Sequence, residues 1–487
     1  MSKNDHQPEH NKQGYLWCIL IGSCLLLEGS FVYGVEPGKL SKALSMLHQT
    51  RALTESIKEE PWRALALNSL SLRYASAEDG DRAIKIARII KDEKERESTI
   101  KNIGKTLANQ HQLVTVKELA NSLHSQKYRE EMYLYIAGAQ TKAGSIDAAI
   151  ETTQSIQDGR LKDRGFKAIA LAQTKTGNLD DALQTTRHIR PEWQHFALED
   201  MALSLLEQGD RKAAWRIVSS IKGSYGRSQA IYALVRAFLT NGDIQEASRM
   251  IYHIPRQKEQ NQALSAIAWQ QTQEKSLQAA LKTAARINDA DEYEDSLAGI
   301  VRVLAQTGKI QKGLELAISI KKRVFREKAF EGIIYEYARQ GKVEVALKNL
   351  KTFGFTSYTQ ERLLPRIAMT AARAGHIQKG LNLTRDMSPG FNRNNNLMNI
   401  AVIQAEQSDI AGAQKTIDQM IPSEHAEMDT LIKVGTAQFI SFALTKNGGE
   451  KEALTWVNRQ SNTLNRIMGL LGIVDGLLLQ ETQHETS

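Results

Sequence analysis

Glycine returns along this chain at an interval of about 33 residues, and each of these glycines is followed five positions later by another small residue. One interval is doubled, and Lys275 and Ala280 occupy the corresponding places inside it. A period of this length indicates repeated structural units, each of which contacts mainly its neighbours. The glycines are Gly144, Gly177, Gly209, Gly242, Gly308, Gly341 and Gly375, and the small residues that follow them are Ala149, Ala182, Ala214, Ala247, Gly313, Ala346 and Gly380.

The register continues in both directions when aligned positions are followed rather than glycines. We expect upstream turns at His111 and Glu78, and downstream turns at Ser408 and Gly448. The last step is 40 residues, so about seven extra residues are expected near 422–428. In front of the array, Thr50 and Ile57 lie where the second helix of one further unit would have them. Twelve positions after each turn stands an apolar residue, except for Gln460 in the last unit: Ile90, Leu123, Ile156, Ile189, Ile221, Ile254, Ile287, Ile320, Phe353, Met387 and Met420.

Each unit has the residue spacing of two antiparallel helices. Before the turn at Gly144, Tyr133 and Ile136 follow at helical spacing, and Ala149 and Ile150 do so after it. Glycine at the turn supplies the positive φ that ends a helix. The sequence therefore predicts helix–turn–helix units that bury their apolar faces against neighbouring units. Small residues that allow close helix crossing recur seven positions before the turn, at Gly104, Ala137, Ala170, Ala202, Ala268, Ala368 and Ala401.

With these small residues and turn glycines, the pattern resembles the tetratricopeptide repeat family over most of the chain. The resemblance implies an all-α fold, a right-handed α-solenoid of about eleven to twelve helix–turn–helix repeats of about 33 residues. Two features depart from the family. An Ile, Leu or Met replaces the alanine late in the second helix, and basic residues open the next unit where the family has proline, as at Arg164, Arg227, Arg326 and Arg362. The pentatricopeptide family, which binds RNA, has a slightly longer unit and is the poorer match.

The first 34 residues differ from the repeats. Residues 15–27 form an apolar run that has the length of a signal-peptide core and is short for a membrane span. We expect residues 1–34 to be a signal peptide, with a retained membrane anchor or lipidation at Cys24 as alternatives. We therefore expect the protein to be exported to the periplasm or cell envelope of a bacterium, with a secreted or a membrane-anchored form as further alternatives. The array is expected over 35–464, a C-terminal capping helix over 465–480 and a polar tail over 481–487.

Enzyme chemistry has little support in this sequence. Both cysteines, Cys18 and Cys24, lie in the leader, so the remaining chain has no thiol for a disulfide, a nucleophile or a metal. No metalloprotease, serine hydrolase or phosphate-loop motif occurs. His188, Glu192 and His195 lie close in sequence, but their spacing matches no standard metal site, so we interpret them as surface residues. We predict a non-enzymatic protein with no cofactor and no metal.

The charge distribution is the main functional signal. If the resemblance holds, residues 13, 10, 6, 3 and 2 positions before each turn line a concave groove, and from the turn at His111 onward these positions hold thirteen Lys or Arg against six Asp or Glu. They account for most of the formal net charge of +8. Tyr232 and Phe442 lie on the same stripe, whereas Trp62, Trp193, Trp215 and Trp456 are interpreted as packing residues. The candidate groove residues are Lys101, Lys105, Lys142, Arg164, Lys167, Lys175, Arg236, Trp269, Arg302, Tyr335, Arg339, Arg362 and Arg373.

A basic groove with a few aromatic side chains suits an acidic peptide, an anionic polymer or a nucleic acid. We predict a protein-interaction scaffold of the cell envelope that binds an acidic or extended segment of a partner protein. The alternatives are an anionic-polysaccharide-binding export or assembly factor and, disfavoured by the leader, a pentatricopeptide-like RNA-binding protein. Alternatively, the cations serve only solubility. The apolar segment 465–479 is expected to close the last unit, and the alternative is a contact with another protein copy or with a membrane. Apart from that alternative, we expect membrane contact only through the leader, if the leader is not cleaved.

Overall fold

The computed structural model describes residues 36–421 and 426–479, and within these ranges all regular secondary structure is helical. The predicted all-α helical-repeat architecture is therefore confirmed. The leader 1–34, the tail 481–487 and most of the predicted insertion near 422–428 lie outside the described residues. No described helix is both long and apolar enough to cross a membrane.

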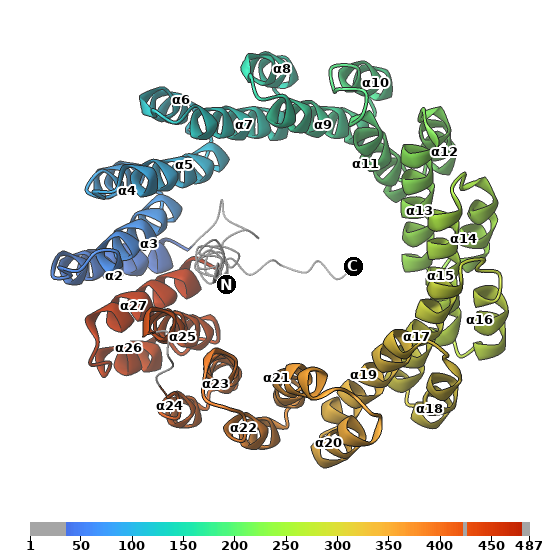
Figure 1. Cartoon of the computed structure of the whole chain (residues 1–487). Coiled ribbons are helices and arrows are strands. Elements are labelled where there is room, and N and C mark those ends of the chain that lie inside the picture. Colours follow the sequence, from blue (N-terminus) through green and yellow to red (C-terminus); the bar gives the residue numbers. More distant parts are fainter. Residues whose placement is uncertain (1–35, 422–425, 480–487) are drawn as a thin grey trace, which may run out of the picture. The chain divides into compact units, whose positions relative to one another are not determined.

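A first helix precedes each predicted turn and a second, mostly shorter helix follows it (Figure 1). The first helices are α3 (Trp62–Ser76), α5 (Glu93–Asn109), α7 (Gln126–Lys142), α9 (Gly159–Lys175), α11 (Gln194–Glu207), α13 (Ser224–Thr240), α15 (Gln257–Gln273), α17 (Ala290–Gln306), α19 (Arg323–Arg339), α21 (Ser357–Arg373), α23 (Phe391–Glu406) and α25 (Ala426–Lys446). The second helices are α4 (Gly80–Ala87), α6 (Leu113–Ser122), α8 (Ile146–Ser155), α10 (Leu179–Thr186), α12 (Arg211–Ser220), α14 (Ile244–Met250), α16 (Leu277–Ala284), α18 (Ile310–Ser319), α20 (Val343–Thr352), α22 (Ile377–Arg385), α24 (Ile410–Ile417) and α26 (Glu450–Asn458). A short 3₁₀ helix, η1 (Ile251–His253), extends α14.

Every predicted turn residue has positive φ, including the four that are not glycine: Glu78, His111, Lys275 and Ser408, with φ between 60° and 66°. The turn at Gly177 shows the reason. The N–H of Asn178 donates to the carbonyl of Gln173 at 2.9 Å, and the N–H of Gly177 donates to Thr174 at 3.1 Å. This pair of hydrogen bonds at the end of a helix requires one residue in the left-handed conformation. The turn positions inferred from the repeat are confirmed.

The small residues of the repeat lie where two helices of a unit cross. Ala170 in α9 and Ala182 in α10 are fully buried, and the equivalent alanines of the other units are buried too. At Gly380, which replaces this alanine, there is no room for a side chain, because a Cβ would stand 2.7 Å from the carbonyl oxygen of Ala368. Close helix crossing therefore explains the small residue five positions after the turn.

Arginine side chains close the connections between units, in the place of the missing proline. Arg227 donates to the carbonyl of Ile221 at 2.9 and 3.0 Å, and Arg326 donates to the carbonyl of Ile320 at 2.9 Å. Each arginine lies six residues after the carbonyl that it binds, so it satisfies the end of the preceding second helix. The hydrogen bonds of the guanidinium thus fix the conformation of this connection, which a proline would restrict through its fixed φ.

The described residues divide into two compact units: unit 1 contains 36–132, 361–421 and 426–479, and unit 2 contains 133–360. In unit 2, α9, α11, α13, α15, α17 and α19 contact one another in sequence, and the second helices pack beside them as a separate layer (Figure 1). Unit 1 is built from both ends of the chain. Its two additional helices are α2 (Pro37–Glu55) and α27 (Thr463–Leu478).

The first and last described helices together form one split repeat in unit 1. α27 contacts α25 on one side and α3 on the other, as a first helix contacts its neighbours, while α2 packs against both α27 and α3. α2 is thus the second helix of a unit whose first helix is α27. Thr50, which indicated a second helix in the sequence, is fully buried in this arrangement. The apolar faces of α27 are consequently covered, with Ile467, Leu471 and Val474 fully buried.

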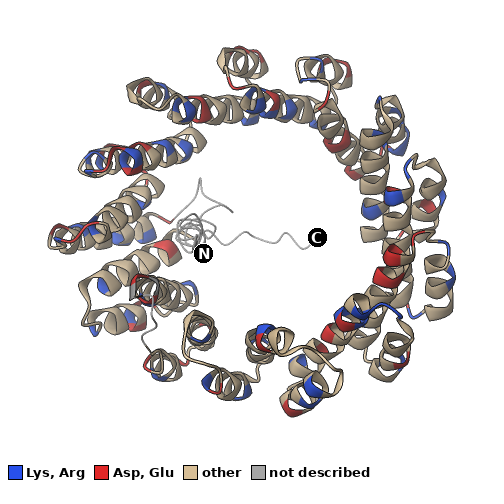
Figure 2. Cartoon of the chain, viewed as in Figure 1, with Lys and Arg blue, Asp and Glu red and all other residues tan. Residues whose placement is uncertain are grey.

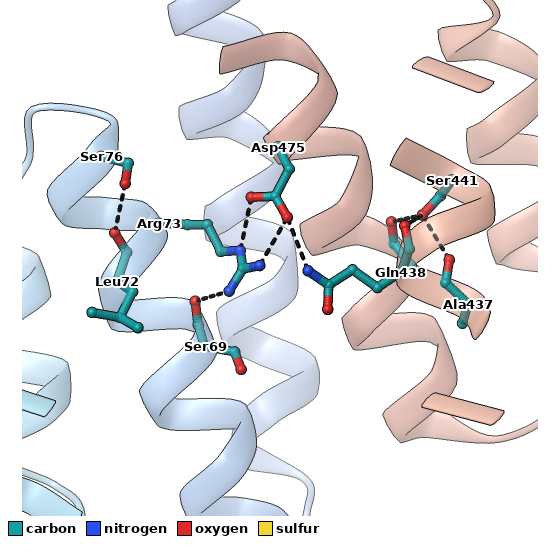
Figure 3. A network of polar contacts seen from close by, with 9 residues as sticks. Ser69, Leu72, Arg73, Ser76, Ala437, Gln438, Ser441 and Asp475 are labelled. Atoms are coloured by element: carbon teal, nitrogen blue, oxygen red, sulfur yellow. Dashed lines mark hydrogen bonds and ion pairs between the residues drawn. The ribbon is translucent and has the colours of Figure 1, made fainter. Parts of the chain in front are cut away.

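A buried ion pair fastens this joint (Figure 3). The Arg73 guanidinium in α3 donates two hydrogen bonds to the Asp475 carboxylate in α27, at 3.0 and 2.8 Å, and both side chains are at most 3% exposed. The remaining groups are also used: Arg73 donates to the carbonyl of Ser69, and the Gln438 amide in α25 donates to Asp475 at 3.0 Å. Every oxygen of the carboxylate is therefore hydrogen-bonded, which is what a buried charge requires.

We expect Asp475→Ala to lower the free energy of unfolding by about 3–5 kcal/mol, because it leaves the Arg73 guanidinium buried without its partner. Replacing both residues by apolar ones, Arg73→Met with Asp475→Leu, should recover most of the loss. Lys42→Ala is the matched control, since the Lys42–Glu450 pair also joins the two ends of the chain but is largely exposed and should cost less than about 1 kcal/mol. Denaturant titration of the three variants checks this, and equal effects of Asp475→Ala and Lys42→Ala would contradict it.

Candidate basic and aromatic binding surface

The predicted groove stripe is exposed at four of its five positions. Residues 13, 10, 6 and 2 places before the turn are mostly exposed or half-buried, but the residue three places before the turn is buried in every unit from α5 onward. That position was wrongly assigned to the groove. It lies one helical turn from the small residue seven places before the turn, so both face the neighbouring helices. The buried residues are Ala108, Thr141, Thr174, Leu206, Leu239, Thr272, Ala305, Ala338, Ala372, Ala405 and Thr445.

All thirteen candidate groove residues are at least partly exposed, but they are not gathered into one site. Four of them, Lys101, Lys105, Arg362 and Arg373, lie in unit 1. Acidic residues lie among the basic ones on the first helices of unit 2 (Figure 2). The nine in unit 2 are spread over six first helices: Lys142, Arg164, Lys167, Lys175, Arg236, Trp269, Arg302, Tyr335 and Arg339.

Several of these cations are paired within the protein. Lys167 donates to Asp200 at 2.6 Å, and Lys101 lies 3.3 Å from Glu131. Arg339 forms an ion pair at 2.6 Å with Glu336, and the hydrogen bond to Glu336 raises the pKa of Arg339. The count of charges from sequence therefore overstates the positive charge that a ligand would meet.

Trp269, one of the aromatic residues of the stripe, packs against the next unit. The Trp269 indole N–H donates to the carbonyl of Ser296 at 3.0 Å, and its ring lies on Gly299, where any Cβ would stand 2.1 Å from the indole nitrogen. The Arg302 guanidinium covers the Trp269 ring at 5.7 Å. These contacts join units and leave little of the ring for a ligand.

One pocket gathers basic and aromatic side chains at the start of α9 and α11. It lies wholly within unit 2 and has a volume of about 250 Å³. Two of the predicted groove residues, Arg164 and Lys167, contribute to it. We refer to it as the α9–α11 pocket, and its lining residues are Arg160, Asp163, Arg164, Lys167, Ile189, Arg190, Trp193 and Phe196.

The α9 wall is set by helical spacing and by one buried carboxylate. Arg160, Arg164 and Lys167 follow at intervals of three or four residues, so they share one face of the helix. Asp163 is 8% exposed and accepts hydrogen bonds from the backbone N–H of Arg190 at 3.1 Å and from its guanidinium at 2.7 Å. Asp163 therefore fixes Arg190 at the rim and is itself satisfied.

The α11 wall is aromatic, and the sequence interpretation did not identify it. Trp193 and Phe196 are 42% and 37% exposed, and their rings stack with centroids 5.6 Å apart. The interpretation of Trp193 as a packing residue is wrong, whereas Trp456 is 6% exposed and does pack. A signal for Phe196 was present, because it lies thirteen positions before Gly209, the place that Arg164 holds before Gly177.

The aromatic wall continues into α13 through His195. The centroid of the His195 ring lies 4.1 Å from that of Phe196 and 5.6 Å from that of Tyr225. The Arg256 guanidinium covers the Tyr225 ring, 5.1 Å from its centroid. The His195 side chain packs on Gly226, where a Cβ would stand 2.6 Å from the His195 Cβ. Burial lowers the pKa of His195 below its ordinary value of 6.5. The Nε2 atom has no hydrogen-bond partner among the described residues.

In the described structure, the pocket carries two arginines without an ion pair at one side, Arg160 and Arg164. The Asp158 carboxylate lies near Arg160: the hydrogen bond from the Leu161 N–H lowers the pKa of Asp158 most, and the Arg160 charge lowers it further. Within the described residues, the structure shows no ion-pair partner for Arg160 or Arg164, whereas Lys167 is paired with Asp200 and Arg190 with Asp163. Beside Lys167, burial and the neighbouring Asp200 raise the pKa of Glu199, and the Lys167 charge opposes this. Arg160 and Arg164 are thus the cations most available to an anionic ligand.

The candidate histidine and carboxylate groups in the described part of the chain have other partners than a metal ion. His188 stacks on Phe166 at 4.9 Å and His195 packs on Phe196, so the two histidines are held by different partners. Glu93, Glu97 and His124 lie close enough to share an ion, but Glu97 already accepts the backbone N–H groups of His124 and Ser125, at 2.6 and 3.1 Å. We therefore interpret this second group as a connection between units.

Because the folded state holds His195 with a lowered pKa, the unfolded chain binds more protons as the pH falls below 6.5. We expect the free energy of unfolding to decrease through this range and to level off below the folded pKa. His195→Gln should remove this part of the pH dependence, as measured by denaturant titrations between pH 8 and pH 5. An unchanged difference between the variant and the wild type across the range would show that the ring does not titrate as described.

No known family matches the sequence, and no curated protein matches it. Among solved structures, the chain is similar to the pentatricopeptide repeat protein PPR10 from maize, with 13% identity, a TM-score of 0.32 and coverage of 88% of this chain and 67% of that one. A structure of Naa15/Naa10 bound to HypK-THB has 14% identity and a TM-score of 0.26, with coverage of 82% of this chain and 69% of that one. A circular tandem repeat protein has 12% identity and a TM-score of 0.11, with coverage of 90% of this chain and 95% of that one.

These scores are too low to support any conclusion about ligands. The classification rests instead on the helix pairs, the turn geometry and the crossing alanines of the chain itself. The chain is a helical-repeat protein whose units resemble tetratricopeptide repeats.

Proposed function

We propose that this chain is a non-enzymatic binding scaffold and that unit 2 holds an acidic, extended segment of a partner protein on its first-helix face. The observation that carries the proposal is the α9–α11 pocket, where Arg160 and Arg164 stand beside the exposed rings of Trp193 and Phe196. Helical-repeat proteins act through such surfaces, because the burial of other faces between units leaves them free. Cations beside apolar surface attract a carboxylate-rich chain and give it a place to dock.

An acidic peptide suits this surface better than a nucleic acid does. Bases bind by stacking on open ring faces. Here Trp193 stacks on Phe196, Phe196 lies against His195, and Arg256 covers Tyr225, so much of the ring surface is occupied by neighbouring side chains. An anionic polysaccharide remains the second class of ligand, because sugar rings can pack on the exposed part of Trp193.

The export of this chain is part of the proposal. It is supported by the apolar run at 15–27 and by the absence of cysteine after residue 24. A fusion of residues 1–60 to a reporter that is active only outside the cytoplasm should be active in a bacterial host. A fusion of residues 36–60 should be inactive, and equal activity of the two fusions would contradict export.

Reversing the charge of Arg160 and Arg164 should weaken binding of an acidic peptide. We expect Arg160→Glu with Arg164→Glu to weaken binding of a fluorescein-labelled polyglutamate peptide at least about tenfold, because two attractive charges become repulsive. Binding to the native chain should also weaken as salt is added. Fluorescence anisotropy at two salt concentrations measures both effects.

The matched control is Lys212→Glu with Lys282→Glu, which changes the net charge equally on exposed residues of the second helices α12 and α16. This control should keep the native affinity. Equal losses in both double variants would contradict a localised site. Tighter binding of a polyuronate or a single-stranded RNA than of polyglutamate at the same salt would assign the surface to that polymer.

A further inference from the structure

The α9–α11 pocket has an apolar interior with a charged rim. Ile189 is 3% exposed and lines the pocket together with the aromatic residues Trp193 and Phe196. Arg160, Arg164 and Lys167 contribute long aliphatic stems before their charged ends. The only acidic residue among those that line the pocket, Asp163, accepts hydrogen bonds from Arg190 with both carboxylate oxygens.

A polar group placed inside this pocket would lose water and find few partners. The Asp163 oxygens already accept from the Arg190 backbone and guanidinium, and the Lys167 ammonium already donates to Asp200. Burial of a polar group without a new hydrogen bond is costly, whereas burial of an apolar side chain is favourable. The interior therefore selects for an apolar group, and the rim selects for negative charge outside it.

The size of the pocket limits what can enter. Pockets for drug-sized ligands generally exceed about 300 Å³, and this one is about 250 Å³. It has room for one large side chain. An extended peptide could insert such a side chain and keep its neighbouring residues at the rim, near Arg160 and Arg164.

We propose that the α9–α11 pocket is an anchor site for one apolar side chain, leucine-like or aromatic, that is flanked by carboxylates in the partner segment. This inference rests on the proposed function and specifies its ligand. The flanking carboxylates pair with Arg160 and Arg164, which have no ion-pair partner in the described structure. Trp193 and Phe196 supply the apolar contact, as aromatic anchors commonly do at interfaces.

The test compares three fluorescein-labelled peptides by anisotropy: a glutamate-rich peptide with a central leucine, the same peptide with a central serine, and the leucine peptide in a glutamine background. We expect the leucine–glutamate peptide to bind about tenfold more tightly than the serine–glutamate peptide, as burial of a leucine side chain supplies. The glutamine-background peptide should bind more weakly than the leucine–glutamate peptide and lose its salt dependence.

Two pocket variants test the residues. Trp193→Ala and Phe196→Ala should each remove most of the preference for leucine over serine, because each truncates a ring that contacts the anchoring side chain. Tyr358→Ala, which truncates an exposed aromatic residue at the start of α21, is the control and should keep the preference. Trp193→Gln, compared with the native chain by thermal unfolding, separates a loss of binding from a loss of folding.

The outcomes separate the inference from the proposed function. Equal affinities for the leucine and serine peptides, both lost in Arg160→Glu with Arg164→Glu, would overturn the anchor pocket and leave the acidic-segment scaffold standing. Equal affinities of the glutamate and glutamine peptides would overturn the requirement for acidic residues, and with it the proposed function. No measurable binding of any peptide would overturn both.

Discussion

Burial between neighbouring units is the constraint on which this structure depends. A pair of helices as short as α9 and α10 cannot cover its own apolar residues, so each pair needs a neighbour on both sides. An open array would leave an uncovered face at each end. In unit 1 the chain avoids this by packing α2 against α27, so that one repeat is assembled from its two ends and its first helix is fully covered. The Arg73–Asp475 pair lies in that joint, and its geometry fixes how the two ends meet.

The same constraint decides which residues a ligand can reach. On a first helix, the positions seven and three before the turn face other helices, and the alanines found there are buried. Only the faces carrying positions 13, 10, 6 and 2 remain accessible, and some of these hold the connections between units, as Trp269 does. The α9–α11 pocket occurs where two of the accessible positions, held by Arg164 and Phe196, meet across a connection. Binding capacity is thus what remains after packing has used the other faces.

The periodic features could be predicted from sequence because they are local. The turn at Lys275 was found without a glycine, since its neighbours in the repeat pattern fixed its position, and its φ of 66° agrees. The pairing of α2 with α27 could not be found in this way. Their residues lie more than 400 positions apart, and no pattern within one repeat tells which first helix will accept an extra second helix. The partners of the surface cations were missed for a similar reason, because pairs such as Lys167–Asp200 join adjacent units.

Phe196 and Trp193 show how composition can mislead about a site. Counting charges along the stripe directed attention to cations, several of which are paired within the fold, whereas the pocket depends on two aromatic residues at the start of α11. Large aromatic side chains that are exposed to water often mark a surface that a binding partner covers. Arg160 and Arg164 form no ion pair in the described structure. Asp158 lies near Arg160 but uses its carboxylate to cap the helix, and Asp163 holds Arg190. The same short segment therefore keeps its carboxylates for the fold and leaves its cations and rings at the surface, which is the arrangement that an acidic partner with one apolar side chain would need.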